Sequence, residues 1–494
     1  MYLLDCYVSN TSRTRNTSII RFFVKSQNSY DFCDIYHILR LTYVRIVLLS
    51  FTANGGVMYR KAIEELKLWK TGLDRKPMII RGARQTGKTW LMKEFGEVYY
   101  ERCAYINFEG NPRMKALFER DFDVERILLG LQLETDSRIT AGETLLLFDE
   151  IQEVPAALSS LKYFCEEAPE HHILAAGSLL GVALHSDTSF PVGKVRFLNL
   201  APMSFPEFLL ATGHEELHDR IGNLDFDMTA VFSGKLTELL REYFLVGGMP
   251  EAVKRFISGN NLSQVRALQI QLLETYEQDF SKHVPHSSIP RIRSVWNSLP
   301  AQLSRENRKF IYGLVRKGAR AREYELAIQW LVDCGMIHKV HRTAKPGIPL
   351  AAYRDTGAFK IFGLDVGLLC AMSDIDPRSI LESNRLFEEF KGALTEQYVL
   401  QQLTAEGLNP FYWSADRSRG EVDFVIQTDG ALFPIEVKAS ENLRSKSLRS
   451  YFERFEPVKA IRTSLSAYRE ENWLINIPLY AINMIRDVVR PLIF

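Results

Sequence analysis

The sequence predicts an α/β fold with a parallel sheet, and three kinds of pattern support that class. An apolar stretch at Pro77–Ile80 leads through a glycine-bracketed loop into "TWLMKEFGEVY", in which Trp90, Leu91, Phe95 and Val98 follow helical spacing. A second apolar run, Thr144–Phe148, ends at an acidic pair. The stretches "RCAYINFEG", "HHILAAGSLLG" and "VRFLNLAP" are three further strand candidates. Because apolar strands alternating with helices are typical of parallel sheets, we expect a five-stranded α/β core.

Length and composition indicate several domains and exclude some classes of protein. A chain of 494 residues holds about three domains on the usual prior. The net charge of +1 excludes a bulk polyelectrolyte but permits a local basic face. The six cysteines form no CxxC or zinc-type pairs, which indicates reduced thiols and a cytoplasmic location. The apolar N-terminal stretch is interrupted by Arg40 and Arg45, so we expect neither a membrane span nor a secretory signal.

Residues 1–57 differ from the rest of the chain. The stretch "VSNTSRTRNTS" is polar, and regular helical spacing begins only with "MYRKAIEELKLWK" at Met58. Codons for the preceding "NGGV" can also contain a bacterial ribosome-binding sequence. We therefore expect residues 1–57 to be a translated leader or disordered extension, with Met58 as the true start.

The glycine-bracketed loop fits the phosphate-binding pattern GxxxxGK(S/T). It consists of Gly82, Ala83, Arg84, Gln85, Thr86, Gly87, Lys88 and Thr89. Glycines let the backbone N–H groups point at a phosphate, the lysine neutralises β- and γ-oxygens, and the threonine hydroxyl ligates Mg²⁺. A strand before the loop and a helix after it favour this interpretation over a structural glycine turn, because the helix N-terminus also attracts anions.

The acidic pair that follows the run Thr144–Phe148 completes the predicted nucleotide site. Asp149 is expected to hold Mg²⁺ through water and Glu150 to polarise the attacking water, as phosphoryl transfer requires. An acidic pair alone is a weak signal, but it becomes a strong one downstream of a phosphate loop. Ser178 follows another predicted strand, where it could sense the γ-phosphate or position water, or equally cap the next helix.

Several stretches together resemble a known family. These are "KPMIIRGARQTGKTWLMKEFG", "LLLFDEIQEVP", "ILAAGSLLGVAL", "PVGKVRFLNLAPMSFPEFLLA" and "YFLVGGMPEAV". From Met58 to the C-terminus the chain resembles prokaryotic AAA-family ATPases that carry a C-terminal domain of unknown function, type 4143. The resemblance implies a RecA-like P-loop core, ATP and Mg²⁺. It assigns phosphate and metal binding to Lys88 and Thr89, the metal to Asp149 and the hydrolytic base to Glu150. It assigns no arginine finger securely, although Arg196 lies near the expected region.

The chain after the predicted ATPase core, residues 58–205, divides into three further regions. Residues 206–285 predict a helical lid, broken at Gly247, Gly248 and Pro250, which could move on hydrolysis or simply pack. Residues 286–375 predict a winged-helix domain of three helices followed by the strand "MIHKVHR" and a Pro/Gly-rich loop. Basic side chains before its third helix suit DNA phosphates, whereas acidic ones on that helix favour an interdomain packing role. Residues 380–494 predict a small α/β domain.

The C-terminal region resembles a restriction-endonuclease-like domain. A predicted helix carries Glu396, and the strands "EVDFVI" and "FPIEVKA" carry Asp423, Glu436 and Lys438. Residues two apart on a strand share a face, which places Glu436 beside Lys438. The spacing is similar to the PD-(D/E)xK pattern, in which carboxylates bind Mg²⁺ and the lysine helps activate water. Val422 stands where that pattern has proline, and a degenerate fold retained for binding is the alternative.

Two classes of function follow from these predictions. In the first, ATP turnover controls the action of the winged-helix and nuclease-like modules on DNA. In the second, the protein is a nucleotide-dependent switch or scaffold in a regulatory or defence assembly, and an inactive C-terminal domain binds protein. The candidate partners are therefore ATP, DNA, and another protein or a second copy of the chain, with no membrane partner.

Overall fold

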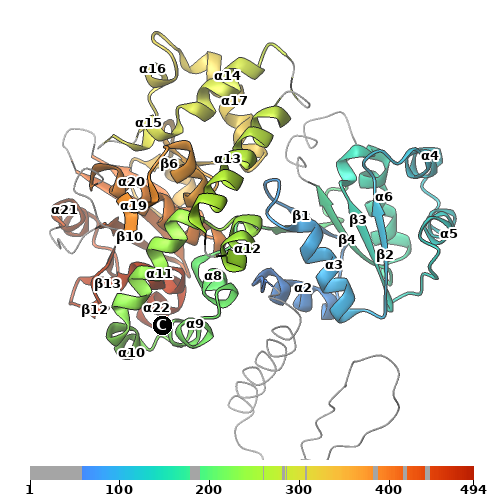
Figure 1. Ribbon diagram of the computed structural model, residues 1–494, viewed down its shortest axis with the longest axis horizontal. Coiled ribbons are helices and arrows are strands. Elements are labelled where there is room, and N and C mark those ends of the chain that lie inside the picture. Colours follow the sequence, from blue (N-terminus) through green and yellow to red (C-terminus); the bar gives the residue numbers. More distant parts are fainter. Residues whose placement is uncertain are drawn as a thin grey trace, which may run out of the picture. The chain divides into compact units, whose positions relative to one another are not determined.

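The structure is a computed structural model, shown in Figure 1. It describes residues 58–177, 190–259, 261–280, 284, 286–305, 309–381, 388–415, 420–439 and 445–493. The predicted leader, residues 1–57, lies outside the described residues.

Five parallel strands form the first sheet, which confirms the predicted α/β core. The strands are β1 (Met78–Arg81), β2 (Arg102–Asn107), β3 (Thr144–Asp149), β4 (His172–Gly177) and β5 (Arg196–Asn199). Their order in the sheet is β2-β3-β4-β1-β5, and every neighbouring pair is parallel. The carboxyl ends of β1 and β3 therefore lie at the same edge, where open α/β sheets bind ligands.

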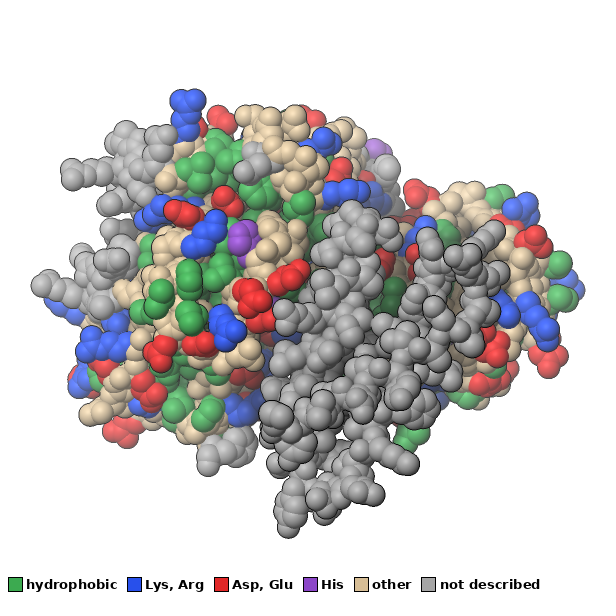
Figure 2. Space-filling model, turned by 60° about the horizontal axis from the view of Figure 1, so that its bottom comes forward, with side chains coloured by type: hydrophobic (Ala, Val, Ile, Leu, Met, Phe, Trp, Pro, Cys, Tyr) green, Lys and Arg blue, Asp and Glu red, His purple; other side chains and the backbone are tan. Residues whose placement is uncertain are grey.

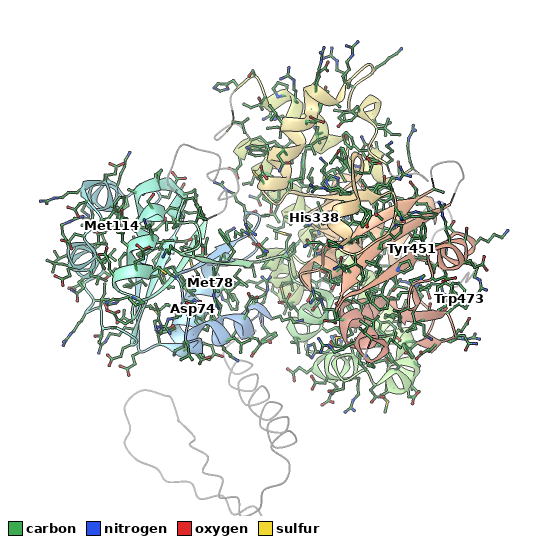
Figure 3. All side chains as sticks on the ribbon, turned by 180° about the vertical axis from the view of Figure 1, so that it is seen from behind. Asp74, Met78, Met114, His338, Tyr451 and Trp473 are labelled. Atoms are coloured by element: carbon green, nitrogen blue, oxygen red, sulfur yellow. The ribbon has the colours of Figure 1, made fainter. Side chains whose placement is uncertain are left out.

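Helices cover both faces of this sheet. They are α2 (Ala62–Thr71), α3 (Lys88–Tyr99), α4 (Pro112–Arg120), α5 (Val124–Thr135) and α6 (Pro155–Glu167). Because strand side chains alternate, Leu147 packs with Met78 in the core beside α2 and α3, whereas Phe148 packs with Met114 beside α4, α5 and α6. Met78 and Met114 are labelled in Figure 3. Burial on both faces explains why the central strands β1, β3 and β4 have almost continuous apolar runs.

The apolar face of α3 differs from the predicted one at one end. Leu91 and Phe95 are buried as predicted, and Met92 is buried beside them. Val98, which has the same helical spacing, is 42% exposed in the last turn of the helix, so the buried face of α3 does not extend to it.

Among the described residues, six helices follow the first sheet, in the region predicted as a lid. They are α8 (Phe205–Ala211), α9 (Glu215–Gly222), α10 (Phe226–Val231), α11 (Ser233–Val246), α12 (Pro250–Gly259) and α13 (Leu262–Asp279). The predicted break between α11 and α12 is present, and Gly247 there has φ +73°. A Cβ on Gly248 would lie 2.1 Å from the carbonyl oxygen of Met203, so the close approach of the two backbones requires glycine.

The region predicted as a winged helix contains short helices and a pair of antiparallel strands. Its elements are α14 (Ile289–Asn297), α15 (Leu299–Leu303), α16 (Tyr312–Val315), α17 (Ala321–Asp333), β6 (Ile337–Thr343), a 3₁₀ turn (Leu350–Tyr353), β7 (Arg354–Gly363) and α18 (Val366–Met372). The first predicted helix is divided at Ser298 into α14 and α15. The identity of this region as a winged helix stays a prediction.

The second sheet has eight strands and includes β6 and β7. The remaining elements are α19 (Pro377–Leu381), α20 (Glu388–Ala405), β8 (Phe411–Ser414), β9 (Glu421–Thr428), β10 (Ala431–Val437), α21 (Lys446–Phe455), β11 (Ala460–Ser464), β12 (Arg469–Glu470), β13 (Leu474–Pro478) and α22 (Ile485–Val489). The strand order is β12-β13-β11-β10-β9-β8-β6-β7. Since β6 pairs with β8, this sheet continues across the predicted boundary at residues 375–380.

The surface charges, the apolar content of the helices and the cysteines can each be compared with what the composition predicts. On the face shown in Figure 2, Lys and Arg side chains are interspersed with Asp and Glu side chains. No helix in the described part of the chain is long and apolar enough to cross a membrane. Within the same residues, Cys103, Cys165, Cys334 and Cys370 are free thiols.

Candidate functional site

The predicted phosphate loop connects β1 to α3, and the structure explains why glycine is needed at two of its positions. Gly87, at the start of α3, has φ +92°, a conformation that glycine adopts without a steric cost. A Cβ on Gly82 would lie 2.3 Å from the carbonyl oxygen of Leu200, so a side chain does not fit there. Gln85 also lies in the left-handed region, with φ 63°. The loop is therefore tightly curled before the N-terminus of α3, which is the geometry that cradles anions.

Lys88 is a buried cation within this loop. Its side chain is 5% exposed, and Nζ donates hydrogen bonds to the carbonyl oxygens of Gly82 (3.0 Å) and Ala83 (2.8 Å). Burial lowers the pKa of Lys88 to about 8, although the nearby carboxylates of Glu150 and Asp149 favour its charged form. An anion beside Nζ would stabilise the ammonium further, so this lysine suits the binding of phosphate oxygens.

The carboxylate of Asp149 accepts three hydrogen bonds at the end of β3. Thr89 Oγ1 donates to Asp149 Oδ2 at 2.8 Å, and the hydroxyl of Tyr105 donates to the same oxygen at 2.9 Å. The backbone N–H of Glu150 donates to Oδ1 at 3.1 Å. Burial and the charge of Asp149 raise the pKa of Tyr105 well above its usual value, so its hydroxyl stays protonated and a donor. The structure thus brings together Thr89 and Asp149, which are far apart in the sequence.

The donor atoms of Thr89 and Asp149 fit a magnesium ion. Mg²⁺ prefers hard oxygen ligands and is usually held by one or two protein groups, with water and substrate phosphates completing its shell. A hydroxyl oxygen beside a carboxylate, 4% exposed and next to a phosphate loop, meets that requirement. Across the residues that the structure describes, no group of three or more His, Cys, Asp and Glu side chains is arranged to hold a metal by itself. Water and the phosphate oxygens of a nucleotide would complete the shell of such an ion.

Glu150 has an unusual backbone conformation. Its φ and ψ are 50° and 45°, in the left-handed region, which costs a non-glycine residue roughly 1–3 kcal/mol. Its Oε2 accepts a hydrogen bond of 2.7 Å from Nε2 of Gln152. This turn places the carboxylate at the end of β3, beside Asp149. Ser178, the other residue predicted to act on the phosphate, lies outside the described residues.

Arg60 donates a hydrogen bond to the backbone of the loop, a role that was not predicted from the sequence. The side chain is 3% exposed, and Nη1 donates to the carbonyl oxygen of Thr86 at 2.7 Å. Nε contacts Glu207 Oε1 at 3.2 Å, so the buried charge is paired. Glu207 also belongs to the capping box of α8. No sequence motif marks Arg60, because its contacts come from distant segments.

Helix α13 contacts the loop from the region predicted as a lid. Arg84 Nη1 lies 2.6 Å from Asp279 Oδ1, and the hydroxyl of Tyr276 donates to the carbonyl oxygen of Arg84 at 2.9 Å. Asp279 is 6% exposed. These contacts attach the middle of the loop to α13. No role was predicted from the sequence for Tyr276 or Asp279.

The C-terminal sheet brings three of the four predicted nuclease residues together. Asp423 Oδ2 accepts a hydrogen bond of 2.8 Å from the backbone N–H of Val437, and Glu436 precedes Val437 on β10. Glu436 Oε1 lies 2.5 Å from Nζ of Lys438. Burial raises the pKa of Glu436, and the charge of Asp423 raises it further, whereas Lys438 lowers it. Asp423 and Glu436 therefore form a carboxylate pair with a lysine beside it.

Glu396, the fourth predicted nuclease residue, contacts a different cation. Its Oε2 lies 4.0 Å from Nζ of Lys360, which is 1% exposed on β7. Lys360 also contacts Glu421 Oε1 at 2.5 Å. Among the described residues, no group of three or more His, Cys, Asp and Glu side chains is arranged to hold a metal, and the nuclease-like site of Glu396, Asp423, Glu436 and Lys438 stays a prediction.

Comparison with solved structures finds distant similarities. A Walker-type ATPase of Pyrococcus abyssi is 15% identical, with a TM-score of 0.42 over 64% of this chain and 96% of that one. The Aeropyrum pernix Orc1 protein in complex with DNA is 14% identical, with a TM-score of 0.27 over 67% and 96%. The Thermotoga maritima RuvB Holliday junction branch migration motor is 12% identical, with a TM-score of 0.25 over 58% and 90%. Scores this low support no conclusion about activity.

Comparison with family models assigns three parts of the chain to known domain families. No curated protein matches the sequence. Residues 237–379 match a domain of unknown function (DUF8612), which extends over parts of the predicted lid and winged helix. Residues 74–209 match an AAA domain and residues 391–481 match a domain of unknown function (DUF4143). With the parallel sheet and the loop geometry, these matches show that the chain combines a P-loop ATPase domain of the AAA type with a C-terminal DUF4143 domain.

Proposed function

We propose that the chain is a cytoplasmic, Mg²⁺-dependent ATPase that couples its nucleotide state to a C-terminal module acting on DNA. One observation carries the ATPase part of this proposal. The hydrogen bond of 2.8 Å between Thr89 and Asp149 joins the phosphate loop to the end of β3, and the charges of Glu150 and Asp149 act on Lys88, which supports one shared site. This arrangement combines a phosphate-binding cation, metal-binding oxygens and a general base, the parts that phosphoryl transfer to water needs.

The residues of this site have separate tasks in the proposed reaction. Lys88 Nζ, with the N–H groups of the loop, binds the β- and γ-phosphate oxygens and neutralises the charge that develops on them. Thr89 and Asp149 hold the magnesium ion, which supplies further neutralisation when it is bound. The carboxylate of Glu150 accepts a proton from the attacking water. Gln152 orients that carboxylate through its 2.7 Å hydrogen bond.

The contacts of the loop support coupling to the rest of the chain. Arg84 is paired with Asp279 of α13. The backbone of Ala83 also lies against Gly335, which follows α17, since a Cβ on Gly335 would be 3.3 Å from the nitrogen of Ala83. A loop that shifts when it binds phosphate would therefore move against both α13 and the turn after α17. In the sequence, both elements come after the ATPase domain and before the strands of the C-terminal sheet.

The proposed DNA contact is based on a basic cluster at the start of α17, formed by three residues before the helix and one in its first turn. Four side chains there are exposed: Arg316, Lys317, Arg320 and Arg322. The exposed face of α17 itself carries Glu323 and Glu325, which phosphates would repel. We therefore propose that the cluster contacts the DNA backbone and that α17 does not enter the major groove.

The first prediction concerns this DNA contact. The affinity of the wild type for duplex DNA is expected to fall with salt and to differ between the ATP and ADP states. Arg320→Ala should lower the slope of log affinity against log salt by about 1, because it removes one phosphate contact. Fluorescence anisotropy at several salt concentrations measures both effects, with the exposed Arg255→Ala on α12 as the matched control. If the affinity for DNA depends neither on salt nor on the bound nucleotide, the result would favour the alternative function, a nucleotide-dependent switch whose C-terminal domain binds protein.

A second candidate activity, DNA cleavage by the C-terminal domain, is favoured by the pair formed by Asp423 and Glu436. Two adjacent carboxylates with Lys438 at 2.5 Å from one of them can share a divalent cation and activate water. The contact between Lys360 and Glu396 supports the alternative, in which the domain is catalytically inactive and binds a partner.

A plasmid assay decides between these two states of the C-terminal domain. If the pair is active, the wild type nicks supercoiled plasmid in Mg²⁺ or Mn²⁺, and Asp423→Ala or Lys438→Ala reduces nicking by at least about 100-fold, as expected for loss of a group that binds metal or activates water. The exposed Asp429→Ala, in the turn between β9 and β10, is the matched control. Equal nicking by all variants would reveal a contaminant. No cleavage in any metal or nucleotide state would leave only the binding role.

A further inference from the structure

Tyr105 is attached to the nucleotide site by one well-defined contact. Its hydroxyl lies 2.9 Å from Asp149 Oδ2, the oxygen that also accepts from Thr89. Tyr105 is on β2, which is next to β3 in the parallel sheet, and its backbone is in register with Leu147, two residues before Asp149. The neighbouring strand thus brings the phenol to the edge of the sheet where the phosphate loop lies.

The ring of Tyr105 is held in place independently of its hydroxyl. Nζ of Lys93, on α3, lies 3.8 Å from the ring centroid, a distance suited to a cation–π contact. The ring also packs against the apolar core beside α2 and α3. A tyrosine fixed by its ring can direct its hydroxyl at Asp149 without losing much additional conformational entropy.

Asp149 has donors on both carboxylate oxygens, and this fixes the plane of the carboxylate. The N–H of Glu150 binds Oδ1, and the hydroxyls of Thr89 and Tyr105 bind Oδ2. Of these donors, the N–H belongs to the backbone and Thr89 is itself a candidate metal ligand. Tyr105 is the side chain whose contribution is limited to the orientation of Asp149.

We propose that Tyr105 is a positioning residue for the Mg²⁺–nucleotide complex, because its hydroxyl holds Asp149 in the orientation that the metal requires. The inference rests on the proposed ATPase function and extends it to a residue outside the phosphate loop and the acidic pair. Groups that orient a metal-binding carboxylate commonly change metal affinity by about 10–100-fold when they are removed. The hydroxyl of Tyr105 should therefore affect metal affinity while leaving metal-free nucleotide binding intact.

Tyr105→Phe separates these two quantities, because it keeps the ring and removes only the hydroxyl. In EDTA, the dissociation constant for ADP should equal that of the wild type, as measured by isothermal titration. In the protein–ADP complex, the dissociation constant for Mn²⁺, followed by electron paramagnetic resonance, should rise about 10–100-fold. Tyr163→Phe is the matched control, because Tyr163 is a half-buried tyrosine on α6 that stacks on Phe122 and lies outside the site.

Three results would overturn the proposal, and they differ from one another. Unchanged Mn²⁺ affinity in Tyr105→Phe would show that the hydroxyl does not orient the carboxylate for a metal. Weaker ADP binding in EDTA would show that Tyr105 supports the loop itself. A wild type that binds no ADP under any condition would refute the proposed ATPase function, and the role of Tyr105 with it. Mn²⁺ affinity that falls with unchanged ADP affinity supports the proposal.

Discussion

Replacing Lys88 by alanine is expected to abolish tight ATP binding. The ammonium group contacts carbonyl oxygens of the loop in this structure, and the phosphate oxygens of ATP would receive the same donors. Each hydrogen bond to a charged group contributes roughly 1.5–3 kcal/mol, so losing contacts to two phosphates weakens binding by about 100-fold or more. Isothermal titration of Lys88→Ala with ATP measures this loss directly.

The matched control for this variant is Lys162→Ala, which removes an exposed lysine of α6. Its affinity for ATP should equal that of the wild type. Thermal unfolding of Lys88→Ala should show no loss of stability, because the substitution removes a buried charge whose desolvation is unfavourable. Unchanged ATP affinity in a folded Lys88→Ala protein would show that the loop is not the nucleotide site.

Glu150→Gln is expected to separate binding from hydrolysis. The amide keeps the size of the side chain but cannot accept the proton of the attacking water, so ATP should bind with nearly wild-type affinity. Loss of a general base commonly costs about 10²–10⁴ in rate. Single-turnover hydrolysis of radiolabelled ATP, combined with isothermal titration, gives the two quantities separately.

Glu153→Gln is the corresponding control, since Glu153 is exposed in the same 3₁₀ turn (Ile151–Glu153). Turnover at the wild-type rate in Glu150→Gln would remove Glu150 from the mechanism. A parallel loss of ATP binding would instead make its role structural, which is a reasonable alternative for a residue with φ 50°.

The local patterns of the sequence were sufficient for the first sheet and for its phosphate loop. The central strands β1, β3 and β4 were predicted because they are buried on both faces, which produces a continuous apolar run, and the partly exposed edge strands β2 and β5 still carry enough apolar residues to be recognised. The break between α11 and α12 was predicted because Gly247, Gly248 and Pro250 each disfavour a continuous helix. These features depend on a few neighbouring residues, and that is the range over which sequence patterns are informative.

The support of the site depends on contacts over long sequence separations, which no local pattern contains. The bond from Tyr105 to Asp149 joins residues 44 apart, and the one from Tyr276 to the loop joins residues 192 apart. Both require the order of strands or the packing of α13 to be known first. Lys360 is a further case, because nothing in "AFKIFG" indicates that its lysine is buried against Glu421.

The eight-stranded sheet has a consequence for dissecting the chain into separately expressed pieces. Because β6 pairs with β8, a fragment that ends before α20, and so before β8, would expose an unpaired strand edge, which promotes aggregation. The same cut would leave the hydroxyl of Tyr243 and the carboxylate of Asp365 without their bonds to Gln401 of α20, inside an apolar core. The DUF4143 region therefore cannot be removed without exposing buried parts of the rest of the chain. The activity measured for a truncated ATPase fragment would be that of a partly unfolded protein. Point substitutions in the full-length chain are therefore the better way to assign a function to each domain.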